Sequence, residues 1–170
     1  MLIIRKPESA EAEALYRIEG ACFPAAEAAS LDAIRHRIEA FEGTFLVLEE
    51  DGVPIGFING CRSAKDRIED EMFLPTCRND ADGDYVLIFS LTVSPDRRGG
   101  GYGRMLMMRL LDDCRAAGVK QAVLTCKEYY VPYYASMGFR NLGMSASTHG
   151  GAVWYDMAID TNVPGDMAEE

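Results

Sequence analysis

A run of glycines and arginines is the first group of residues in this chain whose types and spacing suit a chemical task. Its members follow one another as Arg98-Gly99-Gly100-Gly101-Tyr102-Gly103-Arg104. Glycines let the backbone come close to a ligand and adopt positive φ angles without a Cβ penalty, and arginines add charged hydrogen-bond donors. Three consecutive glycines, a fourth nearby and two flanking arginines therefore favour a phosphate site over a plain left-handed turn, which also needs glycine.

The elements on either side would place this loop at the start of a helix. Residues 85–93 are a nearly unbroken run of apolar, β-branched and aromatic residues, typical of a central strand buried on both faces. From residue 104 to 117 the pattern becomes helical, with an apolar stripe that includes Met107 and Leu110. The first N–H groups of a helix lack internal partners and carry the positive end of its dipole, so a phosphate can complete them.

The loop does not match two common phosphate motifs. It lacks the terminal Gly-Lys-Ser/Thr of a P-loop, which argues against a nucleoside triphosphate held with Mg²⁺. A dinucleotide fingerprint would need a third glycine where Arg104 or Leu106 stands, although Glu128 lies at a plausible distance for a ribose contact. The glycine spacing therefore predicts neither ligand.

The remaining segments predict a mixed α/β fold with the element order βααβββαβαββ. Alternating or continuous apolar runs predict strands, and apolar stripes at helical spacing predict helices. The expected strands, besides 85–93, cover residues 2–5, 44–49, 53–60, 121–126, 139–143 and 152–159, and the further helices cover 9–21, 31–41 and 127–137. The charged residues 62–84 are expected to form a loop, with or without one turn of helix. Residues 1–160 would form a single domain and 161–170 a flexible tail.

Composition and charge exclude several classes of protein. A formal net charge of −10 over 170 residues argues against a nucleic-acid partner, because phosphate binding needs a basic face. Its longest apolar run is too short to cross a bilayer, and its N-terminus has no signal-peptide pattern, so we expect no membrane partner and a cytoplasmic location. Its 5 cysteines lack Cys-x-x-Cys spacing and predict neither a disulfide framework nor a zinc site.

The spacing Arg98-x-x-Gly101-x-Gly103 resembles the acetyl-CoA loop of the GCN5-related N-acetyltransferase (GNAT) superfamily, which reads Gln/Arg-x-x-Gly-x-Gly/Ala between a long strand and a helix. The expected order of elements matches that superfamily over almost the whole chain. Within it, the chain is most similar to the arylalkylamine (serotonin) N-acetyltransferase group. The segments that carry this similarity are Glu19-Gly20-Ala21-Cys22-Phe23-Pro24, Glu27-Ala28-Ala29-Ser30, Asp32-Ala33-Ile34-Arg35-His36, Leu91-Thr92-Val93, Leu124-Thr125-Cys126-Lys127-Glu128, Val131-Pro132-Tyr133-Tyr134 and Gly138-Phe139.

The resemblance implies roles for particular residues. The backbone of Leu91, Thr92 and Val93 would bind the pantetheine arm of acetyl-CoA and polarise the thioester carbonyl. The pyrophosphate would be held by the loop of Arg98, Gly99, Gly100, Gly101, Tyr102, Gly103 and Arg104. Tyr134 matches the tyrosine that protonates the departing CoA thiolate, although paired tyrosines on a short helix are also common packing residues. An apolar slot for an aromatic acceptor would be lined by Phe23, Pro24, Ile88, His149 and Trp154.

The chain differs from this group at the residues that would accept the proton of the amine. Animal enzymes of the group carry two histidines on the central strand, and the matching positions here are Leu87 and Phe89. An alkylammonium must lose a proton before its nitrogen can attack, so ordered water, a loop carboxylate or His149 has to accept it. Glu27 and the acids at 80–84 are candidate amine contacts, while His149 also fits a solvent-exposed turn histidine.

These expectations describe an acetyl-CoA-dependent N-acetyltransferase that needs no metal. Its acceptor would be a small primary amine, preferably an arylalkylamine, and transfer would occur directly within a ternary complex. A polyamine or a protein amine is the alternative acceptor. A CoA-binding sensor without turnover, which the missing histidines would suit, and a binder of a nucleotide phosphate are the alternative functions. The chain would be a monomer or a homodimer.

Overall fold

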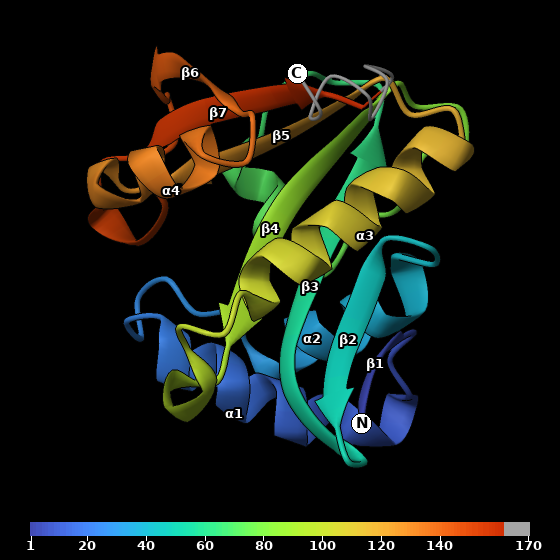
Figure 1. Cartoon of the computed structure of the whole chain (residues 1–170). Helices are drawn as coiled ribbons and strands as arrows, with labels where there is room; N and C mark the ends of the chain where they lie inside the picture. The colour runs from blue at the N-terminus through green and yellow to red at the C-terminus, as the bar shows by residue number, and fades with distance from the viewer. Residues whose placement is uncertain (162–170) are drawn as a thin grey trace.

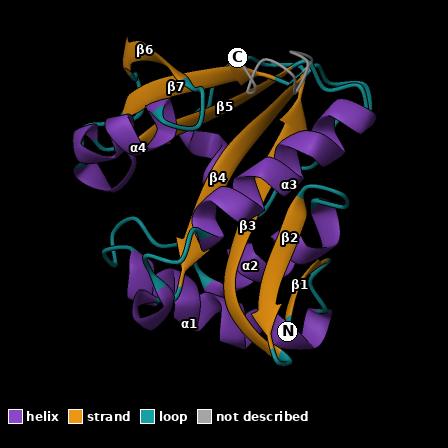
Figure 2. Ribbon diagram, viewed as in Figure 1, coloured by secondary structure: helices purple, strands orange, loops and turns teal. Residues whose placement is uncertain are grey.

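The computed structural model describes residues 1–161 and shows a single sheet flanked by helices (Figures 1 and 2). Within these residues, 7 strands follow the order β1-β2-β3-β4-β5-β7-β6. The strands are β1 (Leu2–Arg5), β2 (Phe45–Glu50), β3 (Val53–Ser63), β4 (Tyr85–Val93), β5 (Gln121–Cys126), β6 (Arg140–Met144) and β7 (Tyr155–Asp160). Neighbouring strands are antiparallel except β4 and β5, which are parallel because a helix connects them. The predicted mixed α/β fold is confirmed.

Helices cover both faces of this sheet. The α-helices in the described part of the chain are α1 (Ala12–Cys22), α2 (Leu31–Ala40), α3 (Tyr102–Ala116) and α4 (Val131–Ala135). Figure 1 shows α3 across one face, with α1 and α2 on the opposite face. Because side chains of a strand alternate between faces, Leu46 and Leu48 pack in the core on the α3 side, whereas Phe45 and Val47 pack with α1 and α2.

β4 separates from β5 part-way along its length (Figure 1). The two strands pair only from Tyr85 to Ile88 on β4. Beyond that point Phe89 is an extra residue in the ladder with β3, because Ser90 pairs with Asn59 and Ile88 pairs with Gly60. Such a bulge bends the strand and increases its twist. The second half of β4 therefore has an edge that β5 does not cover.

Short 3-10 helices account for several differences from the predicted elements, while the strand predicted at 152–159 begins only at Tyr155 and the one predicted at 53–60 extends to Ser63. The 3-10 helices are η1 (Ser9–Glu11), η2 (Asp70–Phe73), η3 (Pro95–Arg97), η4 (Glu128–Tyr130) and η5 (His149–Gly151). The helix predicted at 127–137 is divided into η4 and α4, with Pro132 in the first turn of α4. The helix predicted from 104 begins at Tyr102, because Gly101 adopts a left-handed conformation, with φ of 80°, directly before it.

Thr161 begins the tail that the sequence predicts for residues 161–170. Its side chain is buried, its hydroxyl donates a hydrogen bond to the carbonyl oxygen of Val119, and its N–H donates to that of Lys120 at 2.9 Å. Arg115 Nε in turn donates to the carbonyl oxygen of Thr161 at 2.7 Å. Thr161 is thus fixed to the body of the protein, and residues 162–170 lie outside the described part.

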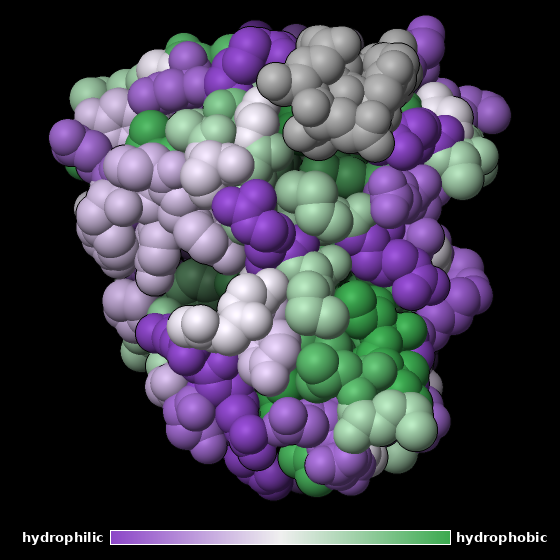
Figure 3. All heavy atoms as spheres, in the orientation of Figure 1, coloured by the Kyte–Doolittle hydropathy of each residue, from purple (hydrophilic) through white to green (hydrophobic). Residues whose placement is uncertain are grey.

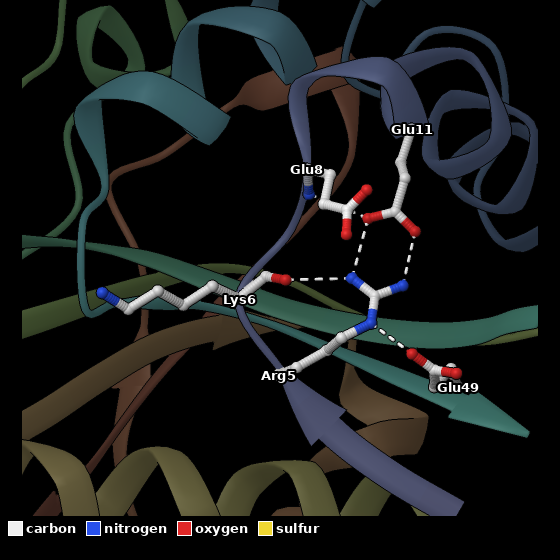
Figure 4. Close-up of polar contacts among 5 residues, drawn as sticks. All are labelled: Arg5, Lys6, Glu8, Glu11 and Glu49. Carbon is white, nitrogen blue, oxygen red and sulfur yellow. Dashed lines mark hydrogen bonds and ion pairs between the residues drawn. The ribbon is translucent and has the colours of Figure 1, made fainter. Parts of the chain in front are cut away.

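Arg5 joins the end of β1 to the segment that leads into α1 (Figure 4). Its Nη1 and Nη2 donate to the two carboxylate oxygens of Glu11 at 2.9 and 2.5 Å, and its Nε donates to Glu49 of β2. Two parallel bonds between a guanidinium and a carboxylate combine charge with fixed geometry. The Arg5 guanidinium consequently lowers the pKa of the Glu11 carboxyl.

The described residues contain no membrane-spanning helix, no cluster of metal-binding side chains and no disulfide. No helix there is long and apolar enough to cross a membrane, and no group of three or more His, Cys, Asp or Glu side chains is placed to hold a metal ion. All five cysteines have free thiols, and the sulfur atoms of Cys61 and Cys77 lie 3.0 Å apart.

Candidate active site

A cavity of about 580 Å³ is lined by the second half of β4, the loop before α3, the end of β5, α4 and the loop between α1 and α2. Figure 3 shows a hollow with an apolar floor between α4 and the loop before α3. The predicted site residues in its lining are Phe23, Pro24, Ile88, Leu91, Val93, Arg98, Gly99, Gly101, Tyr102, Gly103, Arg104, Tyr134, His149 and Trp154. Thr92 and Gly100 are the two predicted residues outside this lining.

The glycine loop forms one end of the cavity, at the N-terminus of α3. Gly99 and Gly101 have φ angles of 88° and 80°, which residues with a Cβ rarely adopt. Gly103 lies in the first turn of α3, where a Cβ would overlap the hydroxyl of Tyr133. These three positions keep side chains away from the first N–H groups of a helix of 15 residues. This is the arrangement that binds a phosphate at a helix N-terminus.

Two arginines flank the loop. Arg98 Nε donates to the carbonyl oxygen of Val93 at 3.3 Å, and Arg104 Nη2 donates to the Ser136 hydroxyl at 3.0 Å. Both guanidinium groups are exposed and contribute to the cavity lining. They place positive charge on both sides of the glycines, as a pyrophosphate ligand requires.

The open edge of β4 forms the middle of the cavity. Leu91 and Val93 belong to the lining, while the Thr92 side chain turns toward β3, where its hydroxyl donates to the carbonyl oxygen of Phe57 at 3.4 Å. Residues 91–93 pair with β3 but not with β5. Apart from the Val93 carbonyl oxygen, which accepts from Arg98, their backbone groups on the β5 side have no strand partner. An uncovered strand edge of this kind can bind an extended chain such as pantetheine.

Tyr134 faces the cavity from α4. Its ring packs edge-on against Tyr133 and Phe139, with centroid distances of 5.1 and 5.9 Å. The ring retains some exposure because it faces the cavity, but the atoms packed around it desolvate the phenol and raise the pKa of Tyr134 far above its usual value. The phenol is thus protonated at neutral pH and has a proton to give.

Aromatic side chains form the other end of the cavity. The ring of His149 stacks on Phe73 with a centroid distance of 4.3 Å, and Trp154 Nε1 donates to the carbonyl oxygen of His149 at 2.9 Å. His149 Nε2 lies 2.9 Å from the carbonyl oxygen of Glu27. Because a carbonyl only accepts, Nε2 is the donor in this contact. The turn that carries His149 is therefore attached to the loop between α1 and α2.

Glu27, which the sequence suggested as an amine contact, forms an ion pair with a lysine of the protein itself. Its Oε2 lies 2.8 Å from Lys127 Nζ, and this side chain of Glu27 is only 8% exposed. The acids at 80–84 are absent from the cavity lining. Of the two positions that carry histidines in the animal enzymes, Phe89 lines the cavity, whereas Leu87 is buried in the core beside Val123.

Two charged residues that were not among the predicted site residues also line the cavity, Glu19 of α1 and Arg37 of α2. They are 2% and 4% exposed. The Arg37 guanidinium carbon lies 5.1 Å from the ring centroid of Phe89, and its Nη1 lies 3.5 Å from the Ser90 hydroxyl. A signal was present in the sequence, because Glu19 is four residues after Leu15 and hence on the apolar stripe of its helix.

A family model described as the acetyltransferase (GNAT) family matches residues 12–139. The match covers well over half of the chain, from α1 to the end of the segment that carries Tyr134. The chain belongs to the GNAT acetyltransferase family. The separated strands β4 and β5 and the glycine loop that follows β4 all lie within the matched residues.

Individual GNAT proteins are similar to this chain over most of its length. Serotonin N-acetyltransferase of Mesocricetus auratus is 28% identical over 148 residues, which cover 86% of this chain and 68% of that protein. The loading GNATL domain of CurA from Lyngbya majuscula has a TM-score of 0.81 at 16% identity, covering 95% of this chain and 98% of that chain. The yncA protein of Salmonella typhimurium, solved with its cofactor acetyl-CoA, has a TM-score of 0.70 at 22% identity, covering 97% and 96%.

GNAT enzymes use acetyl-CoA as the acetyl donor and need no metal, and the residues of this cavity fit that donor. The glycines at 99, 101 and 103 leave room for phosphate at the start of α3, where added Cβ atoms would bring strain or overlap. The uncovered edge of β4 leads from this loop toward the aromatic end of the cavity. The chain is thus an acetyltransferase with a site suited to acetyl-CoA.

Proposed function

We propose that this protein acetylates a small primary amine, preferably an arylalkylamine, by direct transfer within a ternary complex. One observation carries the proposal: a single cavity contains the glycine loop, Tyr134 and the aromatic side chains of Phe73, His149 and Trp154. Donor and acceptor bound in one cavity are held in position to react, and this proximity supplies much of the rate.

The transfer uses groups whose positions are described above. Backbone N–H groups on the open edge of residues 91–93 hydrogen-bond the thioester carbonyl and stabilise the negative charge that develops on its oxygen. The neutral amine forms a C–N bond with the carbonyl carbon as the C–S bond breaks. Tyr134 donates its phenolic proton to the CoA sulfur, a role that suits a protonated phenol facing the cavity.

The aromatic end of the cavity, where the acceptor amine would bind, favours an aromatic amine. Phe23, Pro24, Phe73 and Trp154 surround it with apolar and aromatic surface. The similarity to serotonin N-acetyltransferase supports the same class of acceptor. A polyamine would need several unpaired carboxylates along its length, and of the two carboxylates in the described lining Glu27 is paired with Lys127, which leaves only Glu19. The polyamine is therefore the less supported alternative.

Thiol release from acetyl-CoA tests the proposal directly. We expect release with tryptamine or phenethylamine to exceed release with spermidine or a lysine peptide by at least about tenfold in kcat/KM, because each buried methylene or ring carbon adds binding free energy. Preference for spermidine or for the peptide would contradict the arylalkylamine proposal. Binding of CoA, measured by calorimetry, without thiol release for any amine would instead support the sensor function.

A further inference from the structure

Glu19 lines the cavity, and one oxygen of its buried carboxylate has no close hydrogen bond. It belongs to the lining and is 2% exposed. Its Oε2 accepts the N–H of Ala29 at 2.9 Å, whereas its Oε1 has no close hydrogen-bond partner among the described residues. Buried polar atoms in native proteins nearly always have partners, so an orphaned carboxylate oxygen beside a cavity indicates a missing ligand or water.

Glu19 differs in this respect from the other carboxylate of the lining. Glu27 is bound to Lys127 at 2.8 Å and is thereby neutralised. The charged and titratable groups that face Glu19 are Arg37 from α2 and His149 from η5, with the Ser90 hydroxyl from β4. Burial raises the pKa of Glu19 above its usual value, and the Ala29 N–H, Arg37 and a hydrogen bond from the Ser90 hydroxyl act in the opposite direction.

We propose that Glu19 accepts the proton that the acceptor's ammonium group must lose before attack, a role that rests on the proposed function. Glu19 Oε1, directly or through a water, takes one proton from the ammonium and becomes a neutral carboxyl group. The nitrogen then forms the C–N bond with the thioester carbon while the C–S bond breaks, and the sulfur receives the proton of Tyr134. The second nitrogen proton restores the Tyr134 phenol, and the proton on Glu19 leaves to solvent.

This assignment explains how the enzyme acts without histidines at positions 87 and 89. Phe89 occupies one of these positions, and Arg37 packs over its ring. Arg37 also lies beside Ser90, so a cation stabilises the ionised carboxylate in its buried site. The proton acceptor has moved from the central strand to α1, on the same cavity.

The test compares two acceptors of nearly equal shape in Glu19→Gln and in the matched control Glu39→Gln, which changes an exposed glutamate of α2. Phenethylamine is an ammonium ion at neutral pH, while the two fluorines of 2,2-difluoro-2-phenylethylamine leave much of it neutral. Glutamine keeps an oxygen for the Ala29 N–H but cannot accept the proton. We expect kcat/KM of Glu19→Gln at neutral pH to fall about 100-fold with phenethylamine and less than about fivefold with the difluoro amine.

The loss with phenethylamine should also shrink as the pH rises, because the free amine then arrives without its proton. Equal losses for both amines at every pH would assign Glu19 a merely structural role and overturn the proposal, as would unchanged activity with both. Glu19→Asp, which keeps a carboxylate, should show the wild-type ratio between the two amines. Lack of turnover by the wild-type protein would overturn the proposed function itself, whereas an active wild type with an equally active Glu19→Gln would overturn only this assignment.

Discussion

Lys127, which directly follows β5, forms an ion pair with Glu27 in the loop between α1 and α2, with Nζ 2.8 Å from Oε2. The pair connects two walls of the cavity, and the same loop is bound to His149 through the Glu27 carbonyl oxygen. The Glu27 carboxylate accordingly raises the pKa of Lys127. This connection links the end of β5 to the aromatic end of the cavity.

Lys127→Met should therefore weaken acceptor binding more than donor binding. It leaves the Glu27 carboxylate without its partner, which costs about 1–3 kcal/mol and loosens the loop. We expect kcat/KM for phenethylamine to fall about tenfold, which is about 1.4 kcal/mol. The Kd of acetyl-CoA, measured by calorimetry, should change less than about twofold. Lys120→Met, which removes an exposed pair with Asp84 at 3.7 Å, is the control. Equal effects on both ligands would contradict the interpretation.

Tyr134→Phe should lower kcat with little effect on KM. The phenylalanine keeps the packing against Tyr133 and Phe139 but has no proton to give. A general acid contributes about 100-fold or more, so we expect at least that loss in steady-state thiol release. Tyr16→Phe, on the exposed side of α1, is the control. Because burial raises the pKa of Tyr134, its ionisation should cause no fall in activity as pH rises through about 10. Unchanged turnover of Tyr134→Phe would remove the assignment.

Gly103→Ala should weaken acetyl-CoA binding. The added Cβ would overlap the Tyr133 hydroxyl, so the tyrosine ring has to move within the cavity lining beside the phosphate site. We expect the Kd of acetyl-CoA, measured by calorimetry, to rise about tenfold, or about 1.4 kcal/mol. The double variant with Tyr133→Phe should recover part of the loss, because the overlapping oxygen is gone. A double variant no better than the single one would show that the overlap is not the cause.

Gly20→Ala should stabilise the protein. Gly20 lies on the exposed face of α1, and a Cβ there would meet no atom within 4 Å. Alanine restricts the unfolded chain and favours the helix by about 0.5–1 kcal/mol relative to glycine. Urea denaturation should show the increase in the free energy of unfolding. The same change at Gly43, where φ is 82°, should destabilise the protein and serves as the control.

Arg5→Ala should destabilise the protein at neutral pH by about 1–3 kcal/mol, the range for charged hydrogen bonds. Because Arg5 lowers the pKa of Glu11, the stabilisation is complete above the usual pKa of a glutamate and is lost as pH falls through the lowered value. The difference between variant and wild type in urea denaturation should thus be smaller at about pH 3 than at about pH 7. Arg17→Ala, which loses an exposed pair with Glu13, should show little difference at either pH. A difference independent of pH would contradict the role of the Glu11 pair.

The order of strands and helices and the glycine loop could be predicted because each depends on neighbouring residues. The apolar run of 85–93 forms β4, and the switch to helical spacing marks α3. Because Gly101 has no Cβ, it can adopt the left-handed conformation found directly before α3. The apolar pattern nevertheless predicted the start of this helix two residues too late. Local backbone preferences therefore predict elements better than their ends.

The partners of charged residues could not be predicted in the same way. Glu27 and Lys127 are separated by 100 positions in the sequence, and only the packing of the loop between α1 and α2 beside β5 pairs them. Glu19 and Arg37 each lie on the apolar stripe of a helix, where a charged residue is ambiguous. Whether such a side chain finds a hydrogen-bond or ion-pair partner depends on the residues that the fold places next to it.

The amino-acid sequence alone indicated the GNAT family, through the resemblance of its motifs, and a glycine loop suited to phosphate at the start of a helix, because motif spacing and periodicity are short-range properties of a chain. The tertiary structure decided that Glu27 of the cavity lining has Lys127 as its partner, whereas Glu19 is buried near Arg37 and keeps one oxygen without a close hydrogen bond. That outcome depends on burial and on Coulomb interactions between segments distant in sequence, and both exist only after the helices pack on the sheet.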